Sequence, residues 1–167
     1  MTRLAQYTAA VSTHSQTRDS IACFRGSVIY IADGEVSPPG YPDGVSASPR
    51  LLKGGVELSP YFNDDSPPTG KPNPQVAIGV SADPRRAWII AFDGREEGTS
   101  MDATFLEVAS TFRVLGASDA MGFDGGGSVT LALRNSMGQI EALNTPIQDG
   151  VPGREWPVAN QVLVYFK

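Results

Sequence analysis

The chain has 167 residues, of which 41% are hydrophobic and 19% are charged, and it carries a formal net charge of −5. This composition is ordinary for a globular protein, and the length is most simply one domain, 1–167, with a sizeable core. The acidic balance excludes nucleic-acid binding as the expected function, because that function requires a basic face.

Single residues exclude further classes of site. With only one cysteine, Cys23, no internal disulfide framework can form, and its apolar neighbours predict an inert buried thiol. The only histidine, His14, has no second histidine or cysteine with which to share a metal, so we expect no zinc site, no Ser-His-Asp triad and no cofactor. The N-terminus lacks the apolar core of a signal peptide, and no run reaches transmembrane length. We therefore expect a protein made in the cytoplasm, with no membrane partner.

The first half of the chain reads as short strands and turns. Residues 1–20 are polar and are interpreted either as an arm or as a first edge strand. The expected order then runs from a strand at 28–32 that ends at Asp33-Gly34, through turns at 35–49 and a hairpin at 50–58 with Gly54-Gly55 as its turn, to a loop at 61–74. A loop of that length is either functional or a surface insertion.

Two apolar, β-branched runs, 76–80 and 87–92, are predicted to be central strands. Asp83-Pro84 between them supplies a turn, so we expect an antiparallel hairpin. The second run ends in Asp93-Gly94-Arg95, which places a carboxylate and a guanidinium at the end of a strand.

One helix is expected, over about 100–115. Its apolar stripe at three- to four-residue spacing consists of Met101, Phe105, Val108, Ala109, Phe112 and Leu115. Thr99 and Asp102 resemble a capping box, and Gly116 occupies the position at which glycine ends helices. We expect this stripe to be buried against strands 76–80 and 87–92.

Beyond the helix, 130–134 and 140–143 predict a hairpin, 144–153 a polar loop and 162–166 a closing strand. The predicted fold class is therefore α+β, with a mixed, mainly antiparallel sheet packed against one principal helix at about 100–115.

Three consecutive glycines, Gly125, Gly126 and Gly127, lie between Asp124 and Ser128. Glycine costs roughly 0.5–1 kcal/mol relative to alanine in an ordered segment, so three in a row indicate that some group approaches the backbone closely. Consecutive N–H groups there can form a concave nest for an anion. A plain tight turn between two strands is the other interpretation, since Asp-Gly is a strong hairpin signal.

These residues carry a resemblance to a known family. Asp124-Gly-Gly-Gly-Ser-Val-Thr130 resembles the Asp-Gly-Gly-Gly-Ser-Ser-Thr signature of the phosphodiester glycosidase family, which includes the enzyme that uncovers mannose 6-phosphate tags and many bacterial and phage domains. Further similar motifs follow the family's order over about residues 45–166: Val45–Leu52, Ala77-Ile78-Gly79, Asp93-Gly94-Arg95 and Pro157–Asn160.

The resemblance implies hydrolysis of a sugar-1-phosphodiester bond. Cleaving such a bond requires an acid or base beside the anomeric carbon and donors for the phosphate. Asp124 and Asp93 are the candidate catalytic carboxylates. The candidate substrate-binding groups are Gly125, Gly126, Gly127, Ser128, Thr130 and Arg95, and the expected partner is a carbohydrate or sugar phosphodiester.

The sequence also departs from the family. Gln75 and Trp156 stand where the family usually carries arginine, and the family's N-terminal Asn-Gly-Gly-Phe-Phe segment has at best a degenerate counterpart at 21–26. These departures support an alternative of another class: a catalytically decayed glycan-binding or structural assembly module, for example a phage virion or tail component. Such a module would bind glycans, copies of itself or other subunits.

Overall fold

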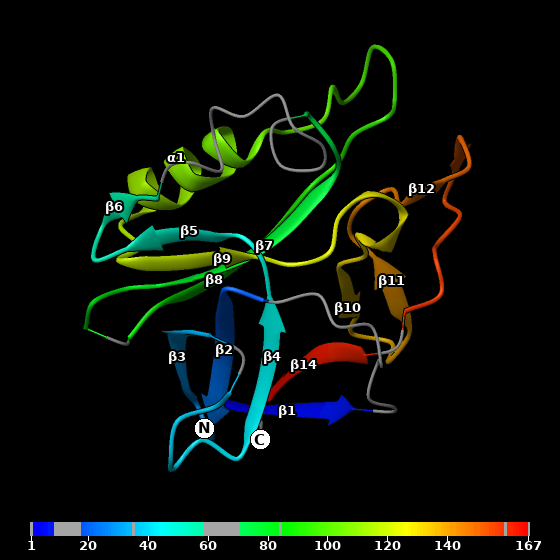
Figure 1. Cartoon of the computed structure of the whole chain (residues 1–167). Helices are drawn as coiled ribbons and strands as arrows, with labels where there is room; N and C mark the ends of the chain where they lie inside the picture. The colour runs from blue at the N-terminus through cyan, green and yellow to red at the C-terminus, as the bar shows by residue number, and fades with distance from the viewer. Residues whose placement is uncertain are drawn as a thin grey trace.

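The computed structural model describes residues 2–8, 18–34, 36–58, 71–83, 85–158 and 160–166. Within them the chain is mainly β, with fourteen strands and one α-helix (Figure 1). The strands are β1 (Thr2–Thr8), β2 (Ser20–Arg25), β3 (Val28–Asp33), β4 (Asp43–Ala47), β5 (Arg50–Lys53), β6 (Val56–Glu57), β7 (Gln75–Val80), β8 (Ala87–Phe92), β9 (Asp119–Gly122), β10 (Ala132–Arg134), β11 (Ile140–Ala142), β12 (Ile147–Gln148), β13 (Val151–Pro152) and β14 (Asn160–Phe166).

The predicted fold class was therefore wrong: the fold is mainly β, not α+β. The only α-helix of the described residues, α1 (Phe105–Leu115), is shorter than expected, whereas strand β2 and strand β4 lie in segments that had no strand prediction. Nor are the sheets mixed, because every paired strand is antiparallel to its neighbour.

The largest sheet has five strands in the order β6-β5-β9-β7-β8. The predicted hairpin of β7 and β8 is confirmed, with Gln75 opposite Phe92 and Val80 opposite Ala87. The hairpin of β5 and β6, turning at the paired glycines, is confirmed as well. The expectation that 87–92 is a central strand was wrong, because β8 lies at the edge of the sheet and β9 occupies the other side of β7.

Alternating residues of β7 face two different layers. Ala77 belongs to a core cluster with Leu51, Val108 and Phe112, which joins helix α1 to one face of the five-stranded sheet. The next residue, Ile78, belongs to a second cluster on the opposite face. This alternation follows from the two-residue period of a strand, and it places the large sheet between two apolar layers.

The second layer is a three-stranded sheet in the order β3-β2-β4. Its Ala22, Phe24, Ile29 and Ile31 share the core cluster of Ile78. Cys23 on β2 is fully buried, as expected, and burial raises the pKa of its thiol. Most of the segment 21–26, which resembled a degenerate family motif, therefore lies in β2, the central strand of this sheet, and Gly26 lies in the turn that follows.

Helix α1 begins one turn later than the apolar stripe suggested. Thr104 is the N-cap: its hydroxyl accepts from the Glu107 N–H, and Glu107 accepts from the Thr104 N–H at 2.8 Å. This is a complete capping box, so the expected pair of Thr99 and Asp102 was wrong. Gly116 ends the helix with φ 88°, as predicted.

The helix face was predicted in part. Phe105, Val108, Ala109 and Phe112 are buried, whereas Met101 precedes the helix and is 77% exposed, and Leu115 is 41% exposed. The buried residues pack on β5 as well as on the predicted strands, since Leu51 and Leu52 belong to their cluster.

Removal of the cap should destabilise the fold modestly and in a pH-dependent way. Thr104→Ala should cost about 0.5–2 kcal/mol of unfolding free energy at pH 7. The Thr104 N–H bond lowers the pKa of the Glu107 carboxyl, so Glu107 stabilises the fold fully above its ordinary pKa of about 4.3, and this contribution is lost as pH falls through the lower folded-state pKa. Chemical denaturation of wild type and Glu107→Gln at several pH values measures how much the Glu107 carboxylate contributes to the free energy of unfolding. A stability difference that grows on acidification would contradict it.

Three two-stranded pairs complete the described fold: β1 with β14, β10 with β11, and β12 with β13. The predicted hairpin of β10 and β11 is confirmed, as is the closing strand, and Thr2–Thr8 forms the edge strand that was one interpretation of the N-terminal segment. The predicted loop at 61–74 lies outside the described residues up to position 70, and so does His14. No described helix is long and apolar enough to cross a membrane.

Candidate functional site

The topology of the five-stranded sheet gathers the candidate residues at one end of its strands. Strands β8 and β9 are both antiparallel to β7, so they run in the same direction. Their C-terminal ends therefore lie on either side of the N-terminal end of β7. Asp93 directly follows β8, Asp124 follows β9 by two residues, and Gln75 opens β7 between them. Residues about 50 positions apart in the sequence are thereby brought to one place.

The glycine segment, Gly125–Gly127, is neither a hairpin turn nor a glycine-rich loop of the expected kind. Gly126–Ser128 forms a short 3₁₀ helix, η1. The Gly126 N–H donates to Pro74 O at 2.9 Å, and the Trp156 N–H donates to Gly127 O at 2.9 Å. Backbone from two other parts of the chain therefore fixes this segment on both sides.

Close approach to the glycines is confirmed, and the approaching groups belong to the chain itself. Gly126 has φ 65°, and a Cβ there would lie 2.7 Å from Nη2 of Arg95. A Cβ on Gly125 would lie 2.8 Å from Pro74 O, and one on Gly127 would overlap the Gln148 side chain. Real Cβ atoms avoid such distances, so Gly125 is required by the backbone of Pro74 and Gly126 by its positive φ, whereas a side chain at position 127 would have to displace the Gln148 side chain.

Arg95 is the cation of the site. Its Nη2 donates to Asn73 Oδ1 at 2.8 Å and its Nη1 to Ile147 O at 3.2 Å, which holds the guanidinium against Gly126. The residue is nevertheless exposed, and its hydrogen bonds to other described residues use two of the five guanidinium N–H groups. Arg95 itself has φ 58°, a strained backbone for a residue other than glycine.

The groups around the glycine segment differ in how they are held. Asp124 is exposed, and its Oδ1 accepts from the Gly125 N–H at 3.0 Å. Ser128 is half-buried at the end of η1, and Thr130 is exposed. Asp124 is thus the carboxylate of the site that faces solvent next to the glycines and the arginine.

Asp93 is used within the protein. Its Oδ1 accepts from Asn144 Nδ2 at 3.0 Å, and the Thr145 N–H donates to both carboxylate oxygens at 3.2 Å. Asn144 also donates to Val129 O at 2.8 Å and accepts from the Leu131 N–H at 2.7 Å. Asp93 therefore anchors the chain that leaves the glycine segment.

The two positions at which the family resemblance leads us to expect arginine both border the glycines. Gln75 is buried, and its Oε1 lies 3.2 Å from where a Cβ on Gly125 would stand. Trp156 contacts Gly127 through its backbone and is 52% exposed. The sequence departs from the family pattern at the site itself.

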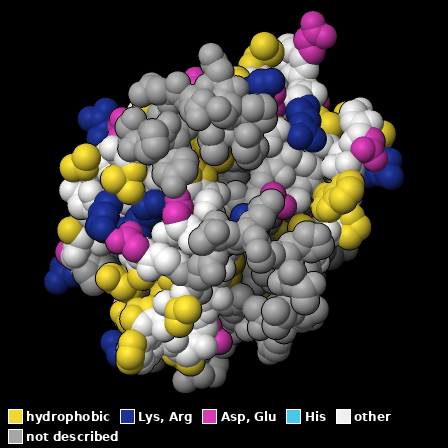
Figure 2. All heavy atoms as spheres, viewed as in Figure 1, with side chains coloured by type: hydrophobic (Ala, Val, Ile, Leu, Met, Phe, Trp, Pro, Cys, Tyr) yellow, Lys and Arg dark blue, Asp and Glu magenta, His cyan; other side chains and the backbone are white. Residues whose placement is uncertain are grey.

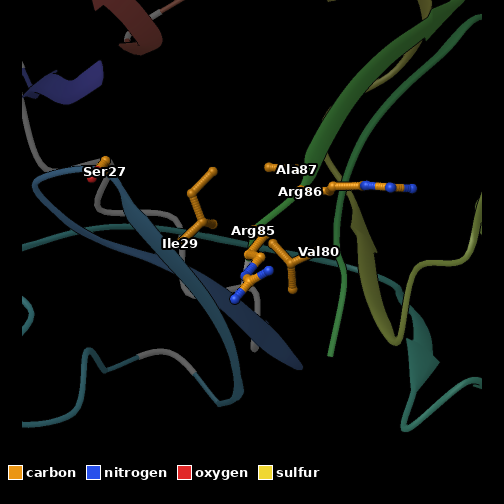
Figure 3. Close-up of a pocket in the computed structure, with 6 residues that line it drawn as sticks. All are labelled: Ser27, Ile29, Val80, Arg85, Arg86 and Ala87. Atoms are coloured by element: carbon orange, nitrogen blue, oxygen red, sulfur yellow. The ribbon is translucent and has the colours of Figure 1, made fainter. Parts of the chain in front are cut away.

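Two hollows on the described surface differ in the size of ligand that they can hold. One, of about 300 Å³, lies beside Arg95 and is lined by Arg95, Glu96, Glu97, Ser100, Met101 and Asp102. The other, of about 60 Å³, lies between β3 and the turn that joins β7 to β8, and Figure 3 shows Arg86 pointing away from its other lining residues. The smaller one has room for a few waters and not for a sugar.

No group of three or more metal-ligating side chains occurs in the part of the chain that the structure describes.

Several residues of the site had no sequence signal. Asn73, which accepts a hydrogen bond from Arg95, lies in a proline-rich stretch, and Gln148, which lies against Gly127, belongs to a predicted polar loop. Asn144 is one polar residue among many, and only the fold brings it to Asp93.

A family model described as phosphodiester glycosidase matches residues 4–165, nearly the whole chain. The chain belongs to the phosphodiester glycosidase family. No curated protein matches the chain.

Nine solved chains match this one. One of them is a hypothetical protein from Synechocystis, 18% identical over 97% of this chain, with a TM-score of 0.55. At that identity the likeness shows the fold alone. The chain spans about a third of the length of this solved relative, 35%. The comparisons do not support the phage virion or tail component that was the example given for the alternative function.

Proposed function

We propose that this domain hydrolyses a sugar-1-phosphodiester, binding the phosphate beside the glycine segment. The observation that carries the proposal is the position of Arg95, which is held against Gly126 by two hydrogen bonds and still exposes its guanidinium. Guanidinium groups bind phosphate oxygens through paired, charge-assisted hydrogen bonds. Asp124 is the exposed carboxylate next to the same glycines.

In the proposed reaction Asp124 acts as the general base. It takes a proton from a water molecule, the water oxygen bonds to the anomeric carbon, and the bond from that carbon to the phosphate oxygen breaks. The phosphate leaves as a monoester that keeps the bonding electron pair, and Arg95 stabilises its charge. Since the Gly125 N–H occupies Oδ1 of Asp124, the other carboxylate oxygen is left for the water.

Asp93 fits a positioning role in this proposal better than a second catalytic one. Its carboxylate already accepts from Asn144 and Thr145, so direct contact with the substrate would require breaking these bonds. Through Asn144 it fixes Val129 and Leu131, the exit from the glycine segment. The catalytic assignment of Asp93 stays a prediction.

A second candidate function is a decayed binding or assembly module of the same family. Gln75 and Trp156 replace cations at the site, and strands β10 and β11 are exposed along their whole length. This hairpin and its neighbourhood carry exposed apolar side chains, including Leu133, Ile140 and Leu143. Hydrophobic side chains also appear in Figure 2 on the right of the view, where Figure 1 draws β11 and β12. Exposed apolar patches of this kind are typical of interaction surfaces, and copies of this chain are the proposed partners.

Turnover of sugar phosphodiesters decides between the two. If the domain is an enzyme, the wild type releases free sugar from a panel of sugar-1-phosphodiesters and UDP-sugars, in the latter with a nucleoside diphosphate as leaving group, and chromatography detects the sugar. If it is a decayed module, wild type is inactive and the double variant Gln75→Arg/Trp156→Arg gains activity, because a phosphate bound without enough cations binds weakly. Wild-type activity that exceeds the double variant's would contradict decay; inactivity of both would contradict hydrolysis.

A further inference from the structure

Strand β8 (Ala87–Phe92) is an open edge of the five-stranded sheet. Its one neighbour in the sheet is β7, and of the described elements only β7 makes an extensive contact with it. The N–H and C=O groups of every second residue of β8 therefore point out of the sheet, with no described strand to pair with. The edge is also regular, because the register with β7 runs without a bulge from Gln75 opposite Phe92 to Val80 opposite Ala87.

This edge has none of the features that keep other strands away. Native sheets commonly protect an edge strand with a proline, a charged side chain or a bulge, whereas β8 reads Ala-Trp-Ile-Ile-Ala-Phe. Trp88 and Ile90 pack on the core on one face of the sheet, and Ile89 packs on the core on the other face. All three are only partly buried. An added strand would therefore pair with the open backbone and cover apolar side chains on both faces.

The charges at the two ends of β8 identify the strand that fits. The basic end, 83–86, carries the exposed Arg85 and Arg86 against one carboxylate, and the acidic end, 93–97, carries three carboxylates against Arg95. In an antiparallel pair of two β8 strands, the basic end of each meets the acidic end of the other. A parallel pair would bring like charges together, which is unfavourable. Charge complementarity thus favours a second copy of this chain.

We propose that two copies of this chain pair antiparallel through β8 about a twofold axis, so that their five-stranded sheets become one continuous sheet. Residues that face each other in an antiparallel pair both point their backbone groups at the other strand or both point them away. Since the two copies use the same outward residues, the axis passes through a residue, and the central ones are Ile89 and Ile90. An axis at Ile90, continued past the strand, sets Arg85 opposite Arg95 of the second copy. An axis at Ile89 sets Arg85 opposite Asp93 instead, so the axis lies at Ile89.

A disulfide cross-link tests this register. The native Cys23 is fully buried, so a cysteine introduced on β8 is the accessible thiol of the described chain. An axis at Ile89 brings the two copies of that residue face to face, within the roughly 7 Å between Cα atoms that a disulfide can span. Mild oxidation should therefore convert Ile89→Cys to a covalent dimer on a non-reducing gel.

Ala87→Cys is the matched control. Ala87 lies on the same strand and is more exposed than Ile89. In the proposed register it faces position 91, so the two copies of position 87 are about 13 Å apart along the strand, too far for a disulfide. It should stay monomeric on the gel. Equal cross-linking of the two variants, or none in Ile89→Cys, would overturn the register.

Charge reversal tests the orientation in proteins that carry no added cysteine. Wild type should sediment as a dimer at about 100 μM, well above the Kd of a specific micromolar complex. Arg85→Glu/Arg86→Glu should raise the dimer Kd at least tenfold, and so should Glu96→Lys/Glu97→Lys, because each places like charges together at both contacts. An equimolar mixture of the two variants should dimerise again, since every end contact then joins opposite charges.

Each of the other outcomes contradicts the proposal. A monomeric wild type at that concentration would refute the dimer. A dimer that both charge reversals leave intact would place the contact elsewhere, for example on the exposed hairpin of β10 and β11. Weakened variants that do not recover on mixing would refute the antiparallel meeting of the two ends. None of these measurements uses turnover, so an inactive dimer would refute hydrolysis alone, and an active monomer would refute the dimer alone.

Discussion

Replacing Phe112 with alanine should lower the free energy of unfolding by about 3–5 kcal/mol, the range for deleting a fully buried aromatic ring. Phe112 is fully buried on α1 in the cluster that joins the helix to the five-stranded sheet. It also lies directly above Gly79 of β7, where a Cβ would come within 2.7 Å of the ring Cε1. A glycine on the strand therefore makes room for the ring, and its removal leaves a cavity that neither element can fill without moving.

Urea denaturation of wild type, Phe112→Ala and Leu115→Ala measures the effect. Leu115 belongs to the same helix, but it is 41% exposed, so its truncation should cost well under the roughly 2–5 kcal/mol of a fully buried leucine, since less buried area is lost and alanine has the higher helix propensity. Equal midpoints for wild type and Phe112→Ala would show that the helix does not pack as described. The double variant Gly79→Ala/Phe112→Ala should lose less than the sum of the two single losses, because the added methyl group occupies part of the cavity.

The contrast between Phe112 and Leu115 shows what periodicity predicts and where it stops. The stripe correctly identified the buried positions 105, 108, 109 and 112, but it carried no information on where the sheet beneath the helix ends.

The capping signals did not fix the residue at which the helix begins. Thr99 with Asp102 and Thr104 with Glu107 have the same spacing, and the second pair forms because Ala103 is held in backbone pairing with Asn73 outside the helix.

Strands were predicted most clearly where they are rich in β-branched and aromatic residues, as in β7 and β8, and strands β2 and β4 were missed. Strand β2 contains Ala22 and Cys23 and β4 contains Gly44, so neither segment has a strong local preference for strand. They become strands because β2 pairs with both β3 and β4 and buries Phe24 against the large sheet. Such tertiary pairing is invisible to a local pattern, and this is why the class α+β was wrong.

The close approach to the three glycines was predictable from the sequence, but the approaching groups were not. The structure brings Arg95 onto Gly126, whereas the roles of Asp124 and Arg95 in a site stay predictions. The sequence could not show that Asp93 is engaged by Asn144, 51 positions away. Nor could it show that Asp102, expected to cap a helix, carries an unpaired oxygen.

Asp124→Asn should reduce kcat about 10²- to 10⁴-fold, the contribution typical of a general acid or base. Asparagine keeps the shape, and its amide oxygen can still accept from the Gly125 N–H, so folding should be unaffected. What it loses is the ability to take a proton from water. Ser128→Ala should have a smaller effect, chiefly on KM, because the arginine and the backbone donors of the glycine segment remain.

Steady-state kinetics on a sugar-1-phosphodiester, with melting temperatures for each variant, measure the difference. Arg95→Lys separates the base from the phosphate site: lysine keeps the charge but loses the fork that reaches both Asn73 and Ile147, so KM should rise more than kcat falls. The assignment of Asp124 as the base fails if Asp124→Asn retains wild-type kcat while Arg95→Lys still raises KM. The phosphate would then be bound as proposed, and another group would activate the water.

Asp93→Asn completes the comparison. It should lower the melting temperature, since the bonds to Asn144 and Thr145 weaken; in a positioning role kcat then falls by much less than the 10²- to 10⁴-fold expected for a lost acid or base, whereas a loss of that size would support a catalytic role.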